Sequence, residues 1–256
     1  MIRGNAADRP ALTLVVPAYN EEESLPALYD RIVAALGEVP AWELILVDDG
    51  SEDGTGAAIR DLERSDPRVR GIRFARNQGQ TAAIAAGIEV ARAPLIATLD
   101  ADLQNDPMDL PGLLDELEDH DAVVGYRVNR QDPWLRRASA RVANVIRDRV
   151  TGDRIRDTGC SLRVFRAEAV RSLTLFEGMH RFLPTLLRFH GFRVIERPVA
   201  HHPRRAGRSK YGIRNRAWLA FKDLLAVRWM GSRILKARAA RSVEDRVPPR
   251  ASASNS

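Results

Sequence analysis

Two aspartates separated by one residue, Asp100 and Asp102, are the strongest chemical signal in this 256-residue sequence. They follow directly after the apolar run Leu95–Leu99, and Gln104 lies two residues further on. A hard divalent cation such as Mg²⁺ or Mn²⁺ binds to one or two carboxylates and usually keeps substrate phosphate oxygens as further ligands. An Asp-x-Asp pair at the end of a buried strand can therefore bind metal and a ribose hydroxyl. Taken alone, the pair fits a helix N-cap or a turn equally well.

Two further polar clusters come earlier in the chain, each after an apolar run. A carboxylate at Asp48 can accept a hydrogen bond from the N–H of a nucleobase, and Gly50 allows a ligand to approach the backbone closely. Tyr19 and Glu21 can supply base stacking and a polar contact. Each cluster is also explained by helix capping, for example by Ser51 or Asp53, and taken alone this explanation is favoured for the cluster Asp48–Ser51.

The elements between these clusters determine where they lie. The expected strands are Leu12–Pro17, Trp42–Val47, Val69–Phe74 and Pro94–Leu99, and the helical patterns between them are Glu21–Leu36, a helix ending at Leu62, and Gln80–Ala91. Continuous apolar strands that alternate with helices predict a parallel sheet covered on both faces. Ligands bind outside the carboxyl ends of such strands. Three acidic loops on that edge repel one another unless a cation or a donor-rich ligand joins them.

The second half of the sequence is less regular. Its expected elements are a strand over Asp121–Tyr126, a basic amphipathic helix over Trp134–Val150, a strand over Ser161–Phe165, a helix over Glu177–Phe189, a strand over Arg193–Val199 and a helix over Arg214–Arg238. We expect residues 1–10 to be a flexible N-terminus and residues 242–256 to be a disordered tail.

Four motifs in this order resemble glycosyltransferase family 2, which has the GT-A fold. They are Val15–Leu25, Leu46–Thr55, Asn77–Gly87 and Thr98–Pro107. Three later segments are similar to the polyprenyl-phosphate branch, of the dolichol-phosphate mannose synthase type: Val124–Arg127, Asp157–Arg166 and Arg205–Gly212. The resemblance implies a Rossmann-like α/β catalytic domain over residues 11–212, with a mostly parallel sheet and helices on both faces. A basic amphipathic helical segment over residues 213–241 follows it.

The resemblance also implies site residues, position by position. The nucleotide sugar would contact Pro17, Tyr19, Glu21, Asp48, Asp100, Ala101 and Asp102. Mg²⁺ or Mn²⁺ would be held by Asp100, Asp102 and Gln104, and the acceptor phosphate by Arg127, Arg205, Ser209 and Lys210. The catalytic set would be Asp102, Gln104, Arg127, Arg205 and Lys210. For Asp157 we expect a structural role, with orientation of an arginine or contact with the sugar as alternatives.

The reaction that the resemblance implies is inverting transfer of a hexose to a polyprenyl phosphate, either dolichyl or undecaprenyl, with mannose from GDP-mannose as the first expectation. A lipid phosphate is already anionic near pH 7, so this reaction needs positive charge to hold the nucleophile and no catalytic base. The alternative is a UDP-sugar-dependent transferase of the same family that acts on polyprenyl phosphate or on a sugar hydroxyl in polysaccharide synthesis. A hydroxyl acceptor requires a carboxylate base, and no convincing candidate follows Asp157.

The net charge of +6 is distributed unevenly. Between His201 and Arg241 there are twelve Lys or Arg residues and a single acid, Asp223. This basic end predicts a polyanionic partner. We expect a polyprenyl phosphate lipid, together with an anionic membrane surface or a membrane-protein partner. We expect no nucleic acid, because a nucleic-acid-binding module has no use for three acidic loops. The single cysteine, Cys160, excludes an intrachain disulfide framework and fits a reducing cytosol.

Membrane association is expected to be peripheral. No uncharged apolar stretch reaches the roughly 18 to 20 residues of a membrane-spanning helix, and the N-terminus lacks the apolar core of a signal peptide. Trp218, Phe221, Leu225 and Trp229 fall within about 80° of a helical wheel, among lysines and arginines. This pattern fits a helix lying on an anionic membrane, at the cytoplasmic face, or a helix that packs the stripe on its own domain.

Overall fold

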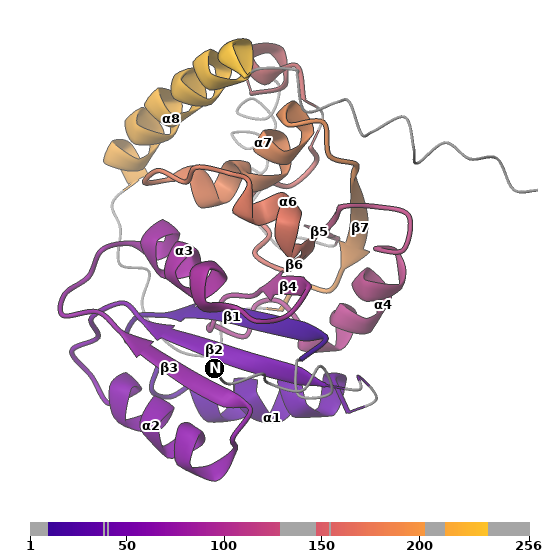
Figure 1. Ribbon diagram of the computed structural model, residues 1–256. Coiled ribbons are helices and arrows are strands. Elements are labelled where there is room, and N and C mark those ends of the chain that lie inside the picture. The colour runs from indigo at the N-terminus through magenta and orange to yellow at the C-terminus, as the bar shows by residue number, and fades with distance from the viewer. Residues whose placement is uncertain are drawn as a thin grey trace, which may run out of the picture.

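The computed structural model describes residues 10–37, 39, 41–128, 147–153, 155–202 and 213–234, with the side chains of the last helix described from Phe221 onward. Within these residues the chain forms one seven-stranded sheet with the strand order β3-β2-β1-β4-β6-β5-β7. Helices cover both faces of this sheet (Figure 1). The expected α/β fold is confirmed.

All strands but one run in the same direction. They are β1 (Leu12–Ala18), β2 (Trp42–Asp48), β3 (Val69–Arg73), β4 (Leu95–Thr98), β5 (Ala122–Arg127), β6 (Arg163–Arg166) and β7 (Val194–Val199). β3, β2, β1 and β4 pair in parallel, and β5 pairs in parallel with β7. β6 lies antiparallel between β4 and β5, which makes the sheet mixed. The expectation of a mostly parallel sheet therefore holds.

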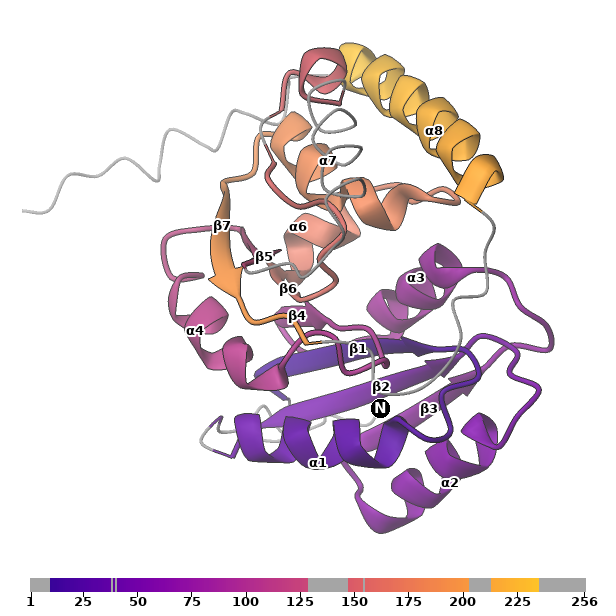
Figure 2. The same ribbon diagram turned by 180° about the vertical axis from the view of Figure 1, so that it is seen from behind.

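Side chains on each strand alternate between two apolar layers. Leu14 of β1 packs in the layer formed with α1 (Leu25–Ala35), α2 (Thr55–Ser65) and α4 (Leu110–Asp115). Its neighbour Val15 packs in the opposite layer, with α3 (Gln80–Val90), α6 (Ala167–Arg171) and α7 (Leu183–Phe189). Burial on both faces explains why the central strands are continuously apolar in sequence. Figure 2 shows the same two layers from behind.

The C-terminal helix α8 (Ile213–Arg233) has two apolar sides. Leu224 and Val227 are buried in a third cluster, formed with η3 (Met179–Phe182) and α7. Phe221, Leu225 and Trp229 are 42%, 47% and 64% exposed, so much of the aromatic stripe stays accessible. Trp218 lies outside the described side chains. None of the helices in the described ranges has the length and apolarity needed to cross a membrane.

Two expected helices differ from the structure. The single helix expected over Glu177–Phe189 is wrong: Gly178 has a φ of 81° and Pro184 lies in the first turn of α7, so the segment divides into η3 and α7. The first helix begins at Leu25 instead of Glu21, because a turn at residues 22–24 precedes it and Pro26 occupies its first turn. Most of the helix expected over Trp134–Val150 lies outside the described residues; residues 147–151 are helical.

Candidate active site

Three loops meet at the carboxyl edge of the sheet, as the strand pattern predicted. The β1–β2 register places Ala18 beside Asp48, and the amide of Asp49 donates to the Ala18 carbonyl at 2.9 Å. Beyond the strands, the Asn20 amide donates to Ser51 Oγ at 2.9 Å, with Asn20 in the left-handed region at a φ of 53°. The register between β1 and β4 places the third loop, which follows Thr98, on the other side of β1.

The two aspartates at the end of β2, Asp48 and Asp49, already have partners within the protein. Asp48 is buried; its Oδ1 accepts from the Ser51 amide at 2.8 Å and its Oδ2 lies 3.2 Å from Arg73 Nε. Asp49 accepts from the backbone amides of residues 78 and 79, at 2.7 and 2.9 Å, and burial raises its pKa. Contact of Asp48 with a nucleobase stays a prediction, and it requires the ligand to share or displace Arg73.

Gly50 is required by a close approach within the chain. Its φ is 72°, and a Cβ atom at this position would lie 2.4 Å from the carbonyl carbon of Arg76. The sequence interpretation assigned the space beside Gly50 to a ligand. In the structure, the backbone of Arg76 and Asn77 occupies it.

The loop after β1 is partly exposed at the same edge. Pro17 lines a cavity there, and Tyr19 and Glu21 are half-buried. The Glu21 amide donates to Thr55 Oγ1 at 2.8 Å, while its carboxylate accepts from Ser24 Oγ at 2.8 Å. Glu21 therefore joins the start of α1 to the start of α2, and its contact with a nucleotide stays a prediction.

Asp100 and Asp102 lie in a tight turn after β4. Asp100 is half-buried; its Oδ1 accepts from Gln80 Nε2 at 2.6 Å, and its backbone amide donates to Ser161 Oγ at 3.1 Å. Asp102 is 8% exposed and accepts from the Gln104 amide at 3.2 Å. Leu103, which lies between Asp102 and Gln104, has a φ of 59°. This conformation is strained for a leucine and is typical of functional loops. The side chain of Ala101 packs in the core, so only its backbone can face a ligand.

The electrostatic surroundings of Asp100 and Asp102 favour the binding of a cation. Burial and then the charge of Asp102 raise the pKa of Asp100 to about 6, against the opposing effects of the Ser161 hydroxyl, Arg163 and Arg127. A cation bound at this pair would relieve both unfavourable effects. Two carboxylates supply the oxygen ligands that Mg²⁺ and Mn²⁺ prefer. No third His, Cys, Asp or Glu completes a metal cluster in the part of the chain that the structure describes.

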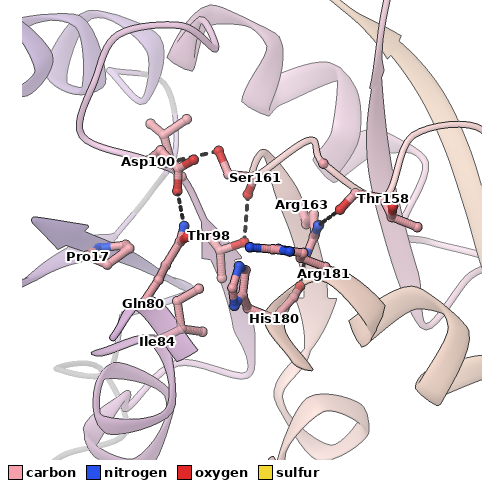
Figure 3. Close-up of a pocket in the computed structure, with 12 residues that line it drawn as sticks. Pro17, Gln80, Ile84, Thr98, Asp100, Thr158, Ser161, Arg163, His180 and Arg181 are labelled. Carbon is pink, nitrogen blue, oxygen red and sulfur yellow. Dashed lines mark hydrogen bonds between the residues drawn. The ribbon is translucent and has the colours of Figure 1, made fainter. Parts of the chain in front are cut away.

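β6 forms one side of the site, where it pairs antiparallel with β4. The β4–β6 register places Thr98 opposite Arg163, and Thr98 Oγ1 donates to the Ser161 carbonyl at 2.8 Å. A cavity of about 220 Å³ lies here, lined on one side by Gln80 and Ile84 of α3 (Figure 3). Its lining includes Pro17, Gln80, Asp100, Ser161, Arg163 and His180.

Arg127 at the end of β5 is held by Asp157. Arg127 Nε donates to Asp157 Oδ2 at 2.7 Å and Nη2 donates to Oδ1 at 2.9 Å, a bidentate pair whose side chains are 16% and 9% exposed. The Asp157 carboxylate also accepts from the Arg127 amide at 3.2 Å and from the Gly159 amide at 3.0 Å. Of the roles considered for Asp157, the structure shows orientation of an arginine.

The last described residues before the predicted phosphate loop, His201 and His202, lie beside the Asp-x-Asp turn. Arg205, Ser209 and Lys210 lie outside the described residues. The segment that leads to them is anchored, because the His202 amide donates to the Gln104 carbonyl at 2.8 Å and His201 forms a β-bridge with Asn105. The chain therefore enters residues 203–212 directly next to the Asp-x-Asp turn.

Several residues of this site were not identified from the sequence. Gln80, Ser161 and Arg163 belong to motifs that were recognised, but no role was assigned to them, and His180 was expected in the middle of a helix. The missing signal is the antiparallel register of β6 against β4, which brings Ser161 and Arg163 beside Asp100.

The chain matches the family model described as glycosyl transferase family 2 over residues 13–174. It belongs to this family. It is 45% identical over 223 residues to a dodecaprenyl-phosphate galacturonate synthase of Rhizobium johnstonii and 40% identical over 212 residues to an undecaprenyl-phosphate 4-deoxy-4-formamido-L-arabinose transferase of Aeromonas hydrophila. These alignments cover 84% and 82% of the chain but 66% and 65% of the relatives, slightly less than two thirds. Both names confirm the expected polyprenyl-phosphate branch.

Solved structures confirm the GT-A-like fold. A glucosyl-3-phosphoglycerate synthase from Mycobacterium tuberculosis, in complex with Mn²⁺, UDP and glucosyl-3-phosphoglycerate, superposes with a TM-score of 0.67 and 17% identity, covering 90% of this chain and 82% of that one. A mannosyltransferase from Pyrobaculum calidifontis, in complex with GDP-mannose and Mn²⁺, gives a TM-score of 0.59 and 20% identity, with coverage of 92% and 77%.

Proposed function

We propose that this glycosyl transferase moves a sugar from a nucleotide diphosphate sugar to a polyprenyl phosphate, in a reaction that depends on a divalent cation and inverts the anomeric centre. One observation supports this above all others. Asp100 and Asp102 form a carboxylate pair of the kind that binds divalent cations. The pair lies at the same edge of the sheet as Arg127, which Asp157 orients, and as the point where the chain leads into the basic segment 203–212.

On the donor side, Asp100 and Asp102 would hold Mg²⁺ or Mn²⁺, with Gln104 beside them in the same turn. A bound divalent cation would stabilise the negative charge of the diphosphate leaving group. Gln80 orients Asp100 by its hydrogen bond, and the Gln104 amide orients Asp102. The loops after β1 and β2 would contact the nucleoside through Pro17, Tyr19, Glu21 and Asp48.

On the acceptor side, the protein would supply positive charge. Asp157 fixes the guanidinium of Arg127 by two hydrogen bonds, so little side-chain entropy is lost when Arg127 binds a phosphate. Arg205, Ser209 and Lys210 would complete the phosphate site. Among the described residues that line the cavity, Asp100 alone carries a carboxylate, and it belongs to the metal pair. This fits an acceptor that is already an anion and needs no base.

The identity of the sugar is a finer question. Mannose from GDP-mannose was the expectation from the sequence, and it stays a prediction that neither of the two polyprenyl-phosphate relatives supports. Those relatives are named for galacturonate and for a formamido derivative of arabinose. We therefore propose that the donor is one of these sugar classes or a hexose, carried by UDP or GDP.

The polyprenyl acceptor places the reaction at a membrane surface, and α8 offers the contact. The exposed side chains Phe221, Leu225 and Trp229 lie on a helix that also exposes Lys222 and Arg228. Aromatic and apolar side chains flanked by basic ones bind to the interface of an anionic membrane. We propose peripheral association with the cytoplasmic face of the membrane through this side of α8.

The test is a transfer assay with radiolabelled nucleotide sugars, Mn²⁺ and a short polyprenyl phosphate. The expected result is a lipid-linked product that is lost on addition of EDTA and in the Asp100→Asn and Asp102→Asn variants. Asp61→Asn, an exposed aspartate on α2, is the matched control and should keep full activity. Absence of a product with every donor, from folded protein, would overturn the proposal. A product formed on a free sugar hydroxyl would favour the alternative acceptor.

A further inference from the structure

Arg163 is a buried cation in the wall of the cavity, and the proposed reaction gives it no role. Its side chain is 3% exposed. Its terminal nitrogens donate to the backbone carbonyls of Thr158, at 2.9 Å, and His180. Its Nε is buried and makes no hydrogen bond to any described residue. These contacts join the loop after residue 157 to η3, but they involve neutral carbonyls, and a neutral donor would serve the same purpose.

No carboxylate among the described residues is devoted to balancing the charge of Arg163. A buried ionised group is costly unless it is paired and fully hydrogen-bonded. The negative charges that act on Arg163 include Asp100 and Asp157. Asp157 is bound to Arg127 by two hydrogen bonds, and Asp100 would belong to the metal when a cation is present. With a metal bound, Arg163 therefore lacks a neutralising partner among the described residues, and a ligand anion would supply one.

The position of Arg163 identifies which part of a ligand it faces. Arg163 pairs with Thr98 in the β4–β6 ladder, so the two side chains lie on the same face of the sheet. Asp100 follows Thr98 by two residues, and both Asp100 and Arg163 line the same cavity. Figure 3 shows Asp100 beside Gln80, and Arg163 beside His180 and Arg181 at a different part of the lining. The cavity of about 220 Å³ is smaller than the roughly 300–1,000 Å³ of sites for larger ligands, so it fits the sugar and not the whole donor.

We propose that Arg163 binds the carboxylate of an acidic donor sugar, so that the enzyme selects a nucleotide-linked hexuronic acid over the corresponding neutral hexose. The inference rests on the proposed function, because the metal site must hold the diphosphate for the sugar to reach this cavity. The diphosphate is the other anion that Arg163 could neutralise, and the experiment separates the two.

The experiment is isothermal titration of the wild-type chain, in Mn²⁺, with UDP, UDP-galactose and UDP-galacturonate. The two sugars differ only at C6, which carries a hydroxymethyl group in one and a carboxylate in the other. Hydrogen bonds to charged groups predict that UDP-galacturonate binds about ten- to hundredfold more tightly than UDP-galactose. Arg163→Gln should abolish this preference and leave the affinity for UDP unchanged. Arg64→Gln, an exposed arginine on α2, is the matched control and should keep the preference.

Each outcome decides the proposal. Equal affinities of the wild-type chain for the two sugars, including affinities too weak to detect, overturn it, and this comparison does not depend on whether Arg163→Gln folds. An equal loss of affinity for all three ligands in Arg163→Gln also overturns it, because Arg163 then binds the diphosphate. Transfer of galactose to polyprenyl phosphate as efficiently as galacturonate contradicts the inference but supports the proposed function. Selective binding of UDP-galacturonate without transfer to polyprenyl phosphate supports the inference about Arg163 and contradicts the proposed function.

Discussion

Replacement of Asp100 by Asn should stabilise the ligand-free protein while it removes activity. The pKa of Asp100 is raised from 3.8 to about 6, mainly by burial and by the charge of Asp102. In the folded state the carboxylate is therefore favoured in its protonated form, so its contribution to stability is complete below pH 3.8 and is lost as pH rises through 6. A shift of about two pKa units corresponds to at most ~3 kcal/mol. Because solvent reaches part of this side chain, we expect about 1–2 kcal/mol.

Thermal unfolding at pH 8 and pH 4, in EDTA, measures this effect. At pH 8 the Asp100→Asn variant should unfold at a temperature about 2–8 °C above that of the wild-type chain, because 1 kcal/mol shifts the midpoint by about 2–4 °C in a protein of this size. At pH 4 the difference should nearly vanish. Mn²⁺ with UDP should raise the midpoint of the wild-type chain and not that of the variant. A variant that is less stable at pH 8, or equally displaced at both pH values, would refute the electrostatic account of this site.

Three further substitutions test the elements that position the site. Asp157→Asn should lower the free energy of unfolding in urea by about 3 kcal/mol and raise KM for the lipid acceptor, because it breaks the bidentate pair on β5; unchanged values would contradict the positioning role. Gly50→Ala should lower the free energy of unfolding in urea by about 3 kcal/mol or more, since its φ is 72° and the added Cβ meets backbone. Gly112→Ala, in open space within α4, is the control and should raise it by about 0.5–1 kcal/mol. Equal effects of the two substitutions would contradict the close approach of backbone at Gly50. Trp229→Ala should weaken co-sedimentation with anionic vesicles about tenfold. Met108→Ala removes another exposed apolar side chain, on η2 (Pro107–Asp109), and should not weaken it; equal losses would argue against docking through α8.

The architecture and the position of the loops followed from local patterns. Apolar runs such as Trp42–Val47 alternate with helical patterns, and this alternation is sufficient to predict a parallel sheet with its loops at one edge. The short helices were not predicted as well. Gly178 and Pro184 divide one expected helix into two, and these two residues are the local signal that should have indicated the break.

The detailed contacts of the site depend on tertiary structure and could not be read from spacing. The pairing of Arg127 with Asp157 joins residues 30 positions apart, and the contact of Ser161 with the Asp100 amide exists only because β6 runs antiparallel to β4. Asp48 is a different case, because its predicted contact with a nucleobase stays a prediction. Its Oδ1 accepts from the Ser51 amide, while its buried Oδ2 lies beside Arg73 and makes no hydrogen bond to the described residues.

The central claim is that Asp100 and Asp102 hold a divalent cation together with the diphosphate of a nucleotide sugar. Isothermal titration of Mn²⁺ into the wild-type chain and into Asp102→Asn, each saturated with UDP, tests it most directly. The wild-type chain should bind one Mn²⁺ ion, and the variant should bind it at least about a hundredfold more weakly, as expected when one of two carboxylate ligands is lost. Equal Mn²⁺ affinity in the two proteins would contradict the claim.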